Sequence, residues 1–210
     1  MFTTPIKLAV VAATSAVALI AAGCGSDDSS SPATTSTTTV AEMPGMNHGA
    51  SSQPTARSDF NDADVTFLQM MYPHHAQAVE MAKLVSSRSQ NAELIALASS
   101  VEQAQSPEMA QITSLLQSFG KPAPNPTMGG HEGMPGMMTD ERMSTLESLS
   151  GPDFDRLWMT MMIEHHRGAI GMANTELAAG TNPESKALAQ AIVAAQQSEI
   201  DRMNRMLAQG

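Results

Sequence analysis

An internal duplication limits this chain to folds that are built from two equivalent halves. The segment DVTFLQMMYPHHAQAVEMA, which begins at Asp64, aligns with DRLWMTMMIEHHRGAIGMA, which begins at Asp155, at an offset of 91 residues. The same offset persists in both directions along the chain. It aligns Gln105 with Gln196, Glu108 with Glu199, and Met43-Pro-Gly-Met46 with Met134-Pro-Gly-Met137. A match of this length indicates two copies of one supersecondary unit.

Each copy is predicted to form two long helices. The expected helices span residues 61–87 and 91–119 in the first copy and 152–180 and 183–208 in the second, with a short extra helix at 140–149 between them. Capping side chains, glycines and prolines between these segments mark the helix ends. No segment has the alternating pattern of a strand. Two αα-hairpins of this length predict an all-α fold, a four-helix bundle.

The N-terminus has the features of an export signal. Residues 1–23 combine Lys7 with an apolar stretch that is too short for a comfortable membrane span. The stretch ends at Cys24, in the position of the lipidated cysteine of a bacterial lipoprotein, although Ala21 stands where such signals usually have leucine. The alternative is an ordinary secretory signal followed by an incidental cysteine. We predict an extracytoplasmic protein of the cell envelope that is held to the membrane only through lipid on Cys24.

The remaining chain divides into a tether and one folded domain. Residues 24–58 are rich in serine, threonine and proline and too poor in apolar residues to bury a core, which predicts a disordered tether. The duplicated domain is expected at 59–210. Its first copy covers about 59–120, a Met/His-rich linker covers 121–138, and the second copy covers about 139–210.

Composition excludes some partners and favours others. The net charge of −10 argues against nucleic acid and favours cations. The chain contains 18 methionines, which outnumber its leucines and so indicate selection for thioethers. Because Cys24 is the only cysteine, the folded part has neither disulfides nor thiolate metal ligands.

Methionine and histidine recur on one face of the first long helix in each copy. In the first copy, Met70, His74 and Met81 fall within about 40° of arc at the helical period, and neighbours at i and i+4 can share one ion. Thioether and imidazole donors without thiolate suit Cu(I) best, with Ag(I) as its analogue, and zinc less well. The predicted metal ligands are Met70, Met71, His74, His75, Met81, Met161, Met162, His165, His166 and Met172.

The same stripe has an alternative interpretation. Methionine packs well in helical cores, so a methionine stripe by itself favours core packing. A buried histidine pair that occurs twice needs partners, which favours ligands over packing. Glu108 and Glu199 lie in the middle of apolar helix faces and need partners too. Each could accept a hydrogen bond from a ligating histidine as an outer-shell group, pair with Arg156 or Arg167, or stay protonated.

Further methionines and histidines cluster outside the long helices. Short His-rich tracts often bind metal, so these flexible tracts could capture an ion and pass it to the bundle, or could be disordered linker only. The residues concerned are Met43, Met46, His48, Met128, His131, Met134, Met137 and Met138.

The paired Met-Met-x-x-His-His-x-x-Ala-x-x-Met-Ala motifs, together with the two Gln-x-x-Glu motifs, resemble a bacterial family catalogued as a domain of unknown function, which includes CopM-type periplasmic copper-binding proteins. The resemblance covers residues 59–210. It implies a ferritin-like fold, copper or silver binding through the ten residues named above, and a part in metal tolerance. Tyr72-Pro73 in the first copy stands where the second has Ile163-Glu164, so the two half-sites are expected to be unequal.

No catalytic constellation is recognisable. A di-iron carboxylate site on such a bundle needs Glu-x-x-His, but Met71 and Met162 stand three residues before His74 and His165. The chain also lacks a phosphate loop, a nucleotide motif and a Cys-x-x-Cys-His haem attachment site. We therefore expect a metal-sequestering or metal-delivering protein, with a donor or acceptor protein as a further partner. The alternatives are a structural or partner-binding bundle and a metal-dependent oxidase.

Overall fold

The prediction of an all-α fold is confirmed. The computed structural model describes residues 57–124 and 134–209, and all regular secondary structure in these two ranges is helical. The long helices begin and end within two residues of the predicted positions. The helices are α1 (Asp62–Arg88), α2 (Ala92–Ser118), α3 (Asp140–Ser148), α4 (Gly151–Ala179) and α5 (Pro183–Gln209).

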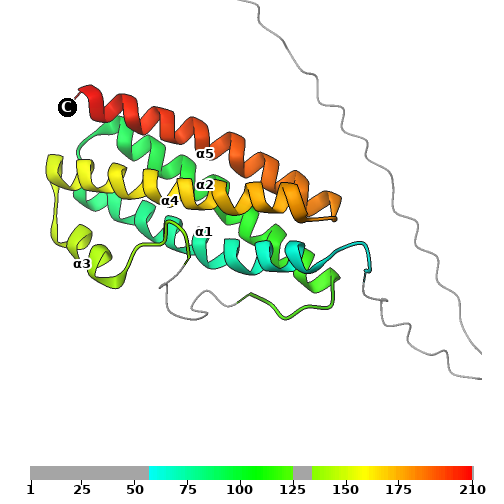
Figure 1. Ribbon diagram of the computed structural model, residues 1–210. Helices are drawn as coiled ribbons and strands as arrows, with labels where there is room; N and C mark the ends of the chain where they lie inside the picture. Colours follow the sequence, from blue (N-terminus) through cyan, green and yellow to red (C-terminus); the bar gives the residue numbers. More distant parts are fainter. Residues whose placement is uncertain (1–56, 125–133, 210) are drawn as a thin grey trace, which may run out of the picture. The chain divides into compact units, whose positions relative to one another are not determined.

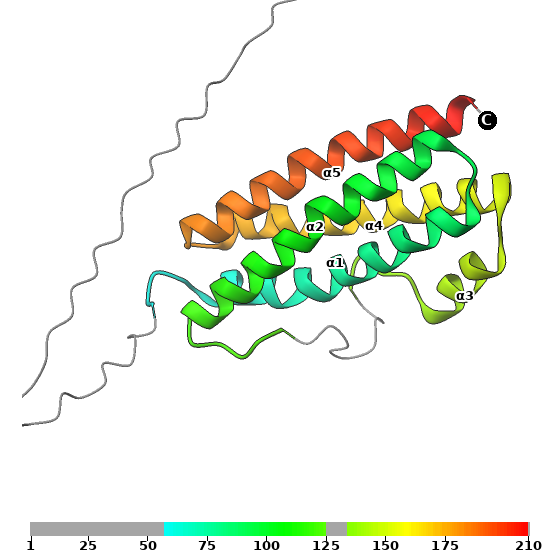
Figure 2. The same cartoon turned by 180° about the vertical axis from the view of Figure 1, so that it is seen from behind.

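The four long helices form a bundle of two αα-hairpins. Helix α1 packs against α2, α4 packs against α5, and the two hairpins meet along α1 and α4, which run in opposite directions (Figures 1 and 2). The short helix α3 precedes α4 and packs against it. Because both hairpins come from the same sequence pattern, the antiparallel α1–α4 contact brings the centre of the Met/His motif in one copy, at His74, next to its counterpart His165 in the other.

Asparagine and threonine side chains determine where most of the helices begin. Asn61 accepts hydrogen bonds from the backbone N–H groups of Ala63 and Asp64, and the Asp64 carboxylate accepts one in return from the Asn61 N–H. This reciprocal arrangement satisfies donors that the first turn of a helix leaves free. The other caps of this kind are Asn91 for α2, Thr139 for α3 and Asn182 for α5.

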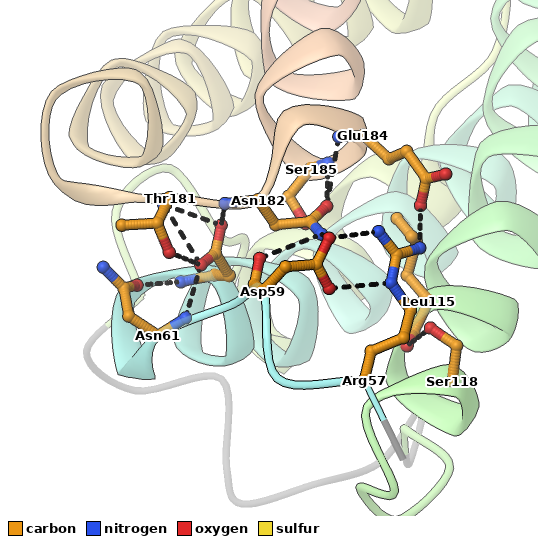
Figure 3. A network of polar contacts seen from close by, with 10 residues as sticks. Arg57, Asp59, Asn61, Leu115, Ser118, Thr181, Asn182, Glu184 and Ser185 are labelled. Carbon is orange, nitrogen blue, oxygen red and sulfur yellow. Dashed lines mark hydrogen bonds and ion pairs between the residues drawn. The ribbon is translucent and has the colours of Figure 1, made fainter. Parts of the chain in front are cut away.

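A polar network ties together the helix ends that lie near the start of α1 (Figure 3). The Arg57 guanidinium pairs with Asp59 at 2.6 Å and with Glu184 at the start of α5. The Arg57 N–H donates to the Ser118 carbonyl at the end of α2. The Asn182 amide donates to the Asp59 carbonyl, so the segment before α1 links both hairpins.

Two apolar clusters make up the core, one toward each end of the bundle. The first cluster includes Phe154, Trp158 and Met81, and the Trp158 indole N–H donates to the Met81 carbonyl at 2.8 Å. The second cluster includes Leu68 and Ile112. Polar side chains from all four long helices lie in sequence between the parts of the helices that contribute to the two clusters. We call them the polar layer: His74, His75, Gln105, Glu108, His165, His166, Gln196 and Glu199.

The segment Met134–Met138, which we call the strap, lies across α1 and α4. Both the N–H and the C=O of Met138 bond to the side-chain amide of Gln77. At Gly136, φ is +80°, and a Cβ there would stand 2.7 Å from the Glu164 carbonyl oxygen. The strap therefore needs glycine to lie flat on α4. Among the described residues, no helix is long and apolar enough to cross a membrane.

Candidate metal site

The site is built around two stacked histidines from the two copies of the motif. The rings of His74 and His165 have centroids 3.8 Å apart and are tilted by 39° to each other, and both side chains are fully buried between α1 and α4. We call this pair the stacked histidines. The His74 Nε2–H donates to the Pro135 carbonyl of the strap at 3.1 Å. This bond fixes the ring tautomer and leaves the His74 Nδ1 lone pair free.

The second histidine of each motif bonds to a glutamate of its own hairpin. The His75 Nε2–H donates to Glu108 at 2.7 Å, and the His166 Nε2–H donates to Glu199 at 2.6 Å. Of the partners that we considered for these glutamates, the structure thus places histidines beside them and not arginines. A carboxylate that accepts from one ring nitrogen leaves the other as a basic lone pair, which is how ligating histidines are commonly oriented.

The polar layer concentrates buried polar atoms that have no partner. Thirteen buried side-chain nitrogen and oxygen atoms of the described residues lack a hydrogen-bond partner, and nine of them belong to the polar layer. Each such atom costs about 1–3 kcal/mol if nothing occupies the space beside it. The nine atoms are His74 Nδ1, His75 Nδ1, both ring nitrogens of His165, His166 Nδ1, and the amide N and O of Gln105 and Gln196.

Burial keeps the stacked rings neutral. Burial, followed by the charge of the neighbouring His75, lowers the pKa of His74 to about 3. Burial also holds the pKa of His165 well below its ordinary value, with the His74 charge as the next cause. A neutral imidazole keeps a lone pair available, which is the form that binds metal ions.

The predicted methionine ligands do not converge on one point. Met70 and Met172 line the same groove between α1 and α4. Their counterparts Met161 and Met81 are buried in the first apolar cluster. The antiparallel crossing of α1 and α4 explains this separation. It places Met70 and Met172 on one side of the stacked histidines and Met81 and Met161 on the other. The two remaining predicted methionine ligands are separated as well: Met71 belongs to the second cluster and Met162 to the first.

The strap methionines differ from the expected flexible tract. Met137 and Met138 are buried, and Met138 belongs to the first apolar cluster. Met134 is partly exposed at the start of the strap. The other residues that we predicted as flexible ligands lie outside the described residues: Met43, Met46, His48, Met128 and His131.

Several polar residues of the site were not predicted. Gln105 and Gln196 are buried in the polar layer, and Gln77 holds the strap. The signal for the first two was present, since they align at the repeat offset and each lies one turn before a glutamate. Gln77 aligns with Gly168, so the second copy has no polar residue at the equivalent position and the repeat gave no signal for Gln77.

Glu176, near the end of α4, was also missed. Its carboxyl group is buried beside the Gly180 backbone. Burial, followed by the neighbouring Asp64 carboxylate, raises the pKa of Glu176 to about 8, and the Lys186 charge opposes this only in part. Asp64 is stabilised as the anion by hydrogen bonds that include the backbone N–H of Asn182 at 2.9 Å.

This raised pKa predicts alkaline destabilisation. A carboxyl group whose pKa is raised on folding contributes stability that is full below its ordinary pKa and is lost as pH rises through the folded value of about 8. The melting temperature should fall by about 3 °C between pH 7 and pH 9. The variant Glu176→Gln, which keeps a neutral group of the same shape, should not show this fall in thermal unfolding. Parallel curves for the two proteins would contradict the prediction.

The donor set favours a soft metal ion. Among residues 57–124 and 134–209, no group of three or more His, Cys, Asp or Glu side chains is arranged to hold a metal ion. A metal in this region therefore needs thioethers in addition to imidazoles. Thioether and imidazole ligands select copper and silver over zinc, magnesium or calcium.

Comparison with known proteins supports the same chemistry. The model of the family described as Domain of unknown function (DUF305) matches residues 64–207 and thus both copies of the repeat. A DUF305 protein from Streptomyces coelicolor, thought to be secreted, is 33% identical with a TM-score of 0.64, and the match covers 70% of this chain and 93% of that one. A DUF305 fragment from Deinococcus radiodurans is 31% identical with a TM-score of 0.67, and the match covers 73% of this chain and 100% of that one.

A third similar structure carries a metal ion. CopM in the Cu(I)-bound form is 27% identical with a TM-score of 0.59, and the match covers 70% of this chain and 96% of that one. Structures of CopM in Cu(II)-bound and Ag-bound forms are similar to this chain as well. No match was found among curated proteins.

Proposed function

The chain belongs to the DUF305 family, and from that premise we propose that it binds copper, as Cu(I) with Ag(I) as its analogue, at the centre of the bundle. The metal is cargo to be sequestered or delivered, and no catalysis is part of the proposal. The observation that carries it is the group of unpartnered ring nitrogens on His74, His75, His165 and His166, all fully buried.

Repetition of these nitrogens argues for a ligand. A single orphaned nitrogen is tolerated in many cores, but here both copies of the motif leave Nδ1 free on both of their histidines. Selection for stability alone would replace such residues by apolar ones of similar volume. An ion that accepts lone pairs from two of these rings would offset part of their desolvation, and the CopM structures with copper or silver support that occupant.

The stacked histidines can take an ion in two ways. His165 has both ring nitrogens free, so either can bind without breaking a bond. His74 can bind through Nδ1 while its Nε2–H still donates to Pro135, or through Nε2 once the strap has released it. Glu108 and Glu199 would keep the rings of His75 and His166 in the tautomer that presents Nδ1.

The cell envelope is the proposed location. The signal-like residues 1–23 and the lipidation of Cys24 would hold the chain on the outer side of a membrane, with residues 24–58 as the tether. Thioether ligands suit that compartment because free thiols are lost there to oxidation. Metal tolerance by sequestration, or delivery to a second protein, follows from this placement.

The test is an anaerobic Cu(I) titration of the full chain against a chromogenic Cu(I) chelator. We expect the double variant His74→Ala/His165→Ala to lower the affinity at least about a hundredfold, because two ligands are lost. The control is His48→Ala/His131→Ala, which removes the two histidines outside the described residues. It should change the affinity by no more than about threefold, since it leaves the four histidines of the polar layer intact.

Two outcomes would overturn the proposal. If the wild-type chain took up no Cu(I), the bundle would be a structural or partner-binding module with methionine as packing. If both double variants lost affinity equally, the site would not lie at the stacked histidines. Far-ultraviolet circular dichroism of each variant confirms that the helices are intact, so that a loss of binding is not a loss of fold.

A further inference from the structure

The groove between the first half of α1 and the last half of α4 is open and lined by thioethers. Its volume is about 620 Å³, and Met70 from α1 and Met172 from α4 both line it. The strap bounds it at Pro135, whose carbonyl accepts the His74 hydrogen bond. The groove therefore ends at the proposed metal site. The remaining residues that line it are Asp62, Ala63, Thr66, Phe67, Gly171, Thr175 and Glu176.

The duplication defines a second, equivalent groove on the same two helices. At the offset of 91 residues, Met70 and Met172 correspond to Met161 and Met81, and Phe67 corresponds to Trp158. These counterparts are buried in the first apolar cluster. The side chains that fill this second groove come from the strap and α3: Met138, Met143 and Leu146, all members of the same cluster. Within residues 57–124 and 134–209, one half of the α1–α4 surface is thus closed by the strap and α3, and the other half is open.

The two copies also differ in sequence at the positions that close the second groove. Met143 and Leu146, which close the second groove, correspond to Ser52 and Thr55 in the first copy. Two polar residues in place of Met and Leu cannot contribute the same apolar burial. In the closed half, Met81 and Met161 have no exposed surface, whereas in the open half Met70 is partly exposed and Met172 is 8% exposed.

The chemistry of the open groove suits a soft monovalent cation. Thioether sulfurs bind Cu(I) and Ag(I) through polarisable lone pairs and have little affinity for hard ions. Asp62, on the exposed rim, adds a carboxylate that attracts cations. Met70 lies one helical turn before His74, so an ion held by Met70 is one turn from the stacked rings.

We propose that Met70 and Met172 form an accessible thioether site that receives Cu(I) or Ag(I) and passes it to the stacked histidines, whereas Met81 and Met161 act only as core. This inference rests on the proposed function and adds the route by which the ion arrives. It makes the two copies of the motif functionally unequal, because only one of the two equivalent methionine pairs lines an open groove.

The test compares two double variants at repeat-equivalent positions, Met70→Leu/Met172→Leu and Met81→Leu/Met161→Leu. Leucine keeps the apolar volume of methionine, so both variants should fold. In anaerobic stopped-flow, Cu(I) capture by the full chain is followed from the absorbance of a chromogenic Cu(I) chelate. We expect the first variant to capture Cu(I) about tenfold more slowly than wild type, a change typical of altered association within one site. The second variant should keep the wild-type rate.

The outcomes separate this inference from the proposed function. If the wild type captures Cu(I) and both variants match its rate, or both slow it equally, the thioether route is wrong while metal binding stands. If the wild type captures no Cu(I), both proposals fail. Thermal unfolding without metal provides a second measurement: a variant whose melting temperature falls well below that of wild type is replaced by its Met→Ile version before rates are compared.

Discussion

Replacing Gly168 by alanine is expected to destabilise the fold by about 3 kcal/mol, a value at the upper end for overpacked cores. A Cβ on Gly168 would stand 2.0 Å from the Pro135 carbonyl oxygen and 2.8 Å from the Gly136 Cα. Neither neighbour is a flexible side chain, so the strap has to move away from α4. That movement would also break the bond from His74 to Pro135 and expose Met138.

The control for this variant lies one turn further along the same helix. Gly171 is exposed, and a Cβ there would meet nothing within 4 Å. Gly171→Ala should therefore stabilise the protein by up to about 1 kcal/mol, the usual gain for alanine over glycine inside a helix. Urea denaturation of both variants measures the difference. Equal effects would show that the strap does not depend on close contact with α4.

Between pH 7 and pH 4.5, the contribution of His74 and His165 to the stability of the metal-free fold is expected to fall by about 5 kcal/mol. His74 and His165 have pKa values below the ordinary value of 6.5, because burial disfavours their charged forms. A group whose pKa is depressed on folding contributes stability above its unfolded pKa, and this stability is lost as pH falls toward the folded value. The loss should thus begin near pH 6.5 and continue as pH falls toward the folded pKa of His74, about 3.

A variant without these rings isolates their contribution. His74→Leu/His165→Leu has no titrating group at the stack, while other groups such as Glu176 titrate in both proteins. The difference in free energy of unfolding between wild type and variant should therefore shift by this amount over the same pH range. The measurement is urea denaturation at several pH values with a chelator present. Stopping at pH 4.5 keeps the carboxylates with lowered pKa values, such as Asp64 and Glu164, in their charged forms. Parallel curves for wild type and variant would contradict the assignment to these histidines.

The fold could be predicted from sequence because its signals are local. Capping residues such as Asn61, Thr139 and Asn182 mark helix starts by hydrogen bonds to residues two or three positions away. Helical periodicity and the repeat then define two hairpins without any knowledge of long-range contacts. The prediction of the family also followed from contiguous motifs, and the match over residues 64–207 confirms it.

The arrangement of the site was harder to predict because it depends on how α1 and α4 cross. A helical wheel places Met70, His74 and Met81 on one face but ignores their separation along the helix axis. An antiparallel crossing brings only His74 next to its own counterpart and sends the methionines to opposite sides. The strap was missed for a similar reason, since Gln77 and Gly168 position it through contacts with residues far away in sequence.

The two apolar clusters have a consequence for the order of events during biosynthesis. Each cluster takes part of α1 and α2 from the first copy and part of α4 and α5 from the second. The first hairpin emerges from the ribosome with the surfaces of both clusters unmatched, and neither can close until the second hairpin has followed. The two copies are therefore not independent folding units, as successive domains are, and the core is completed only after the last helix has been made.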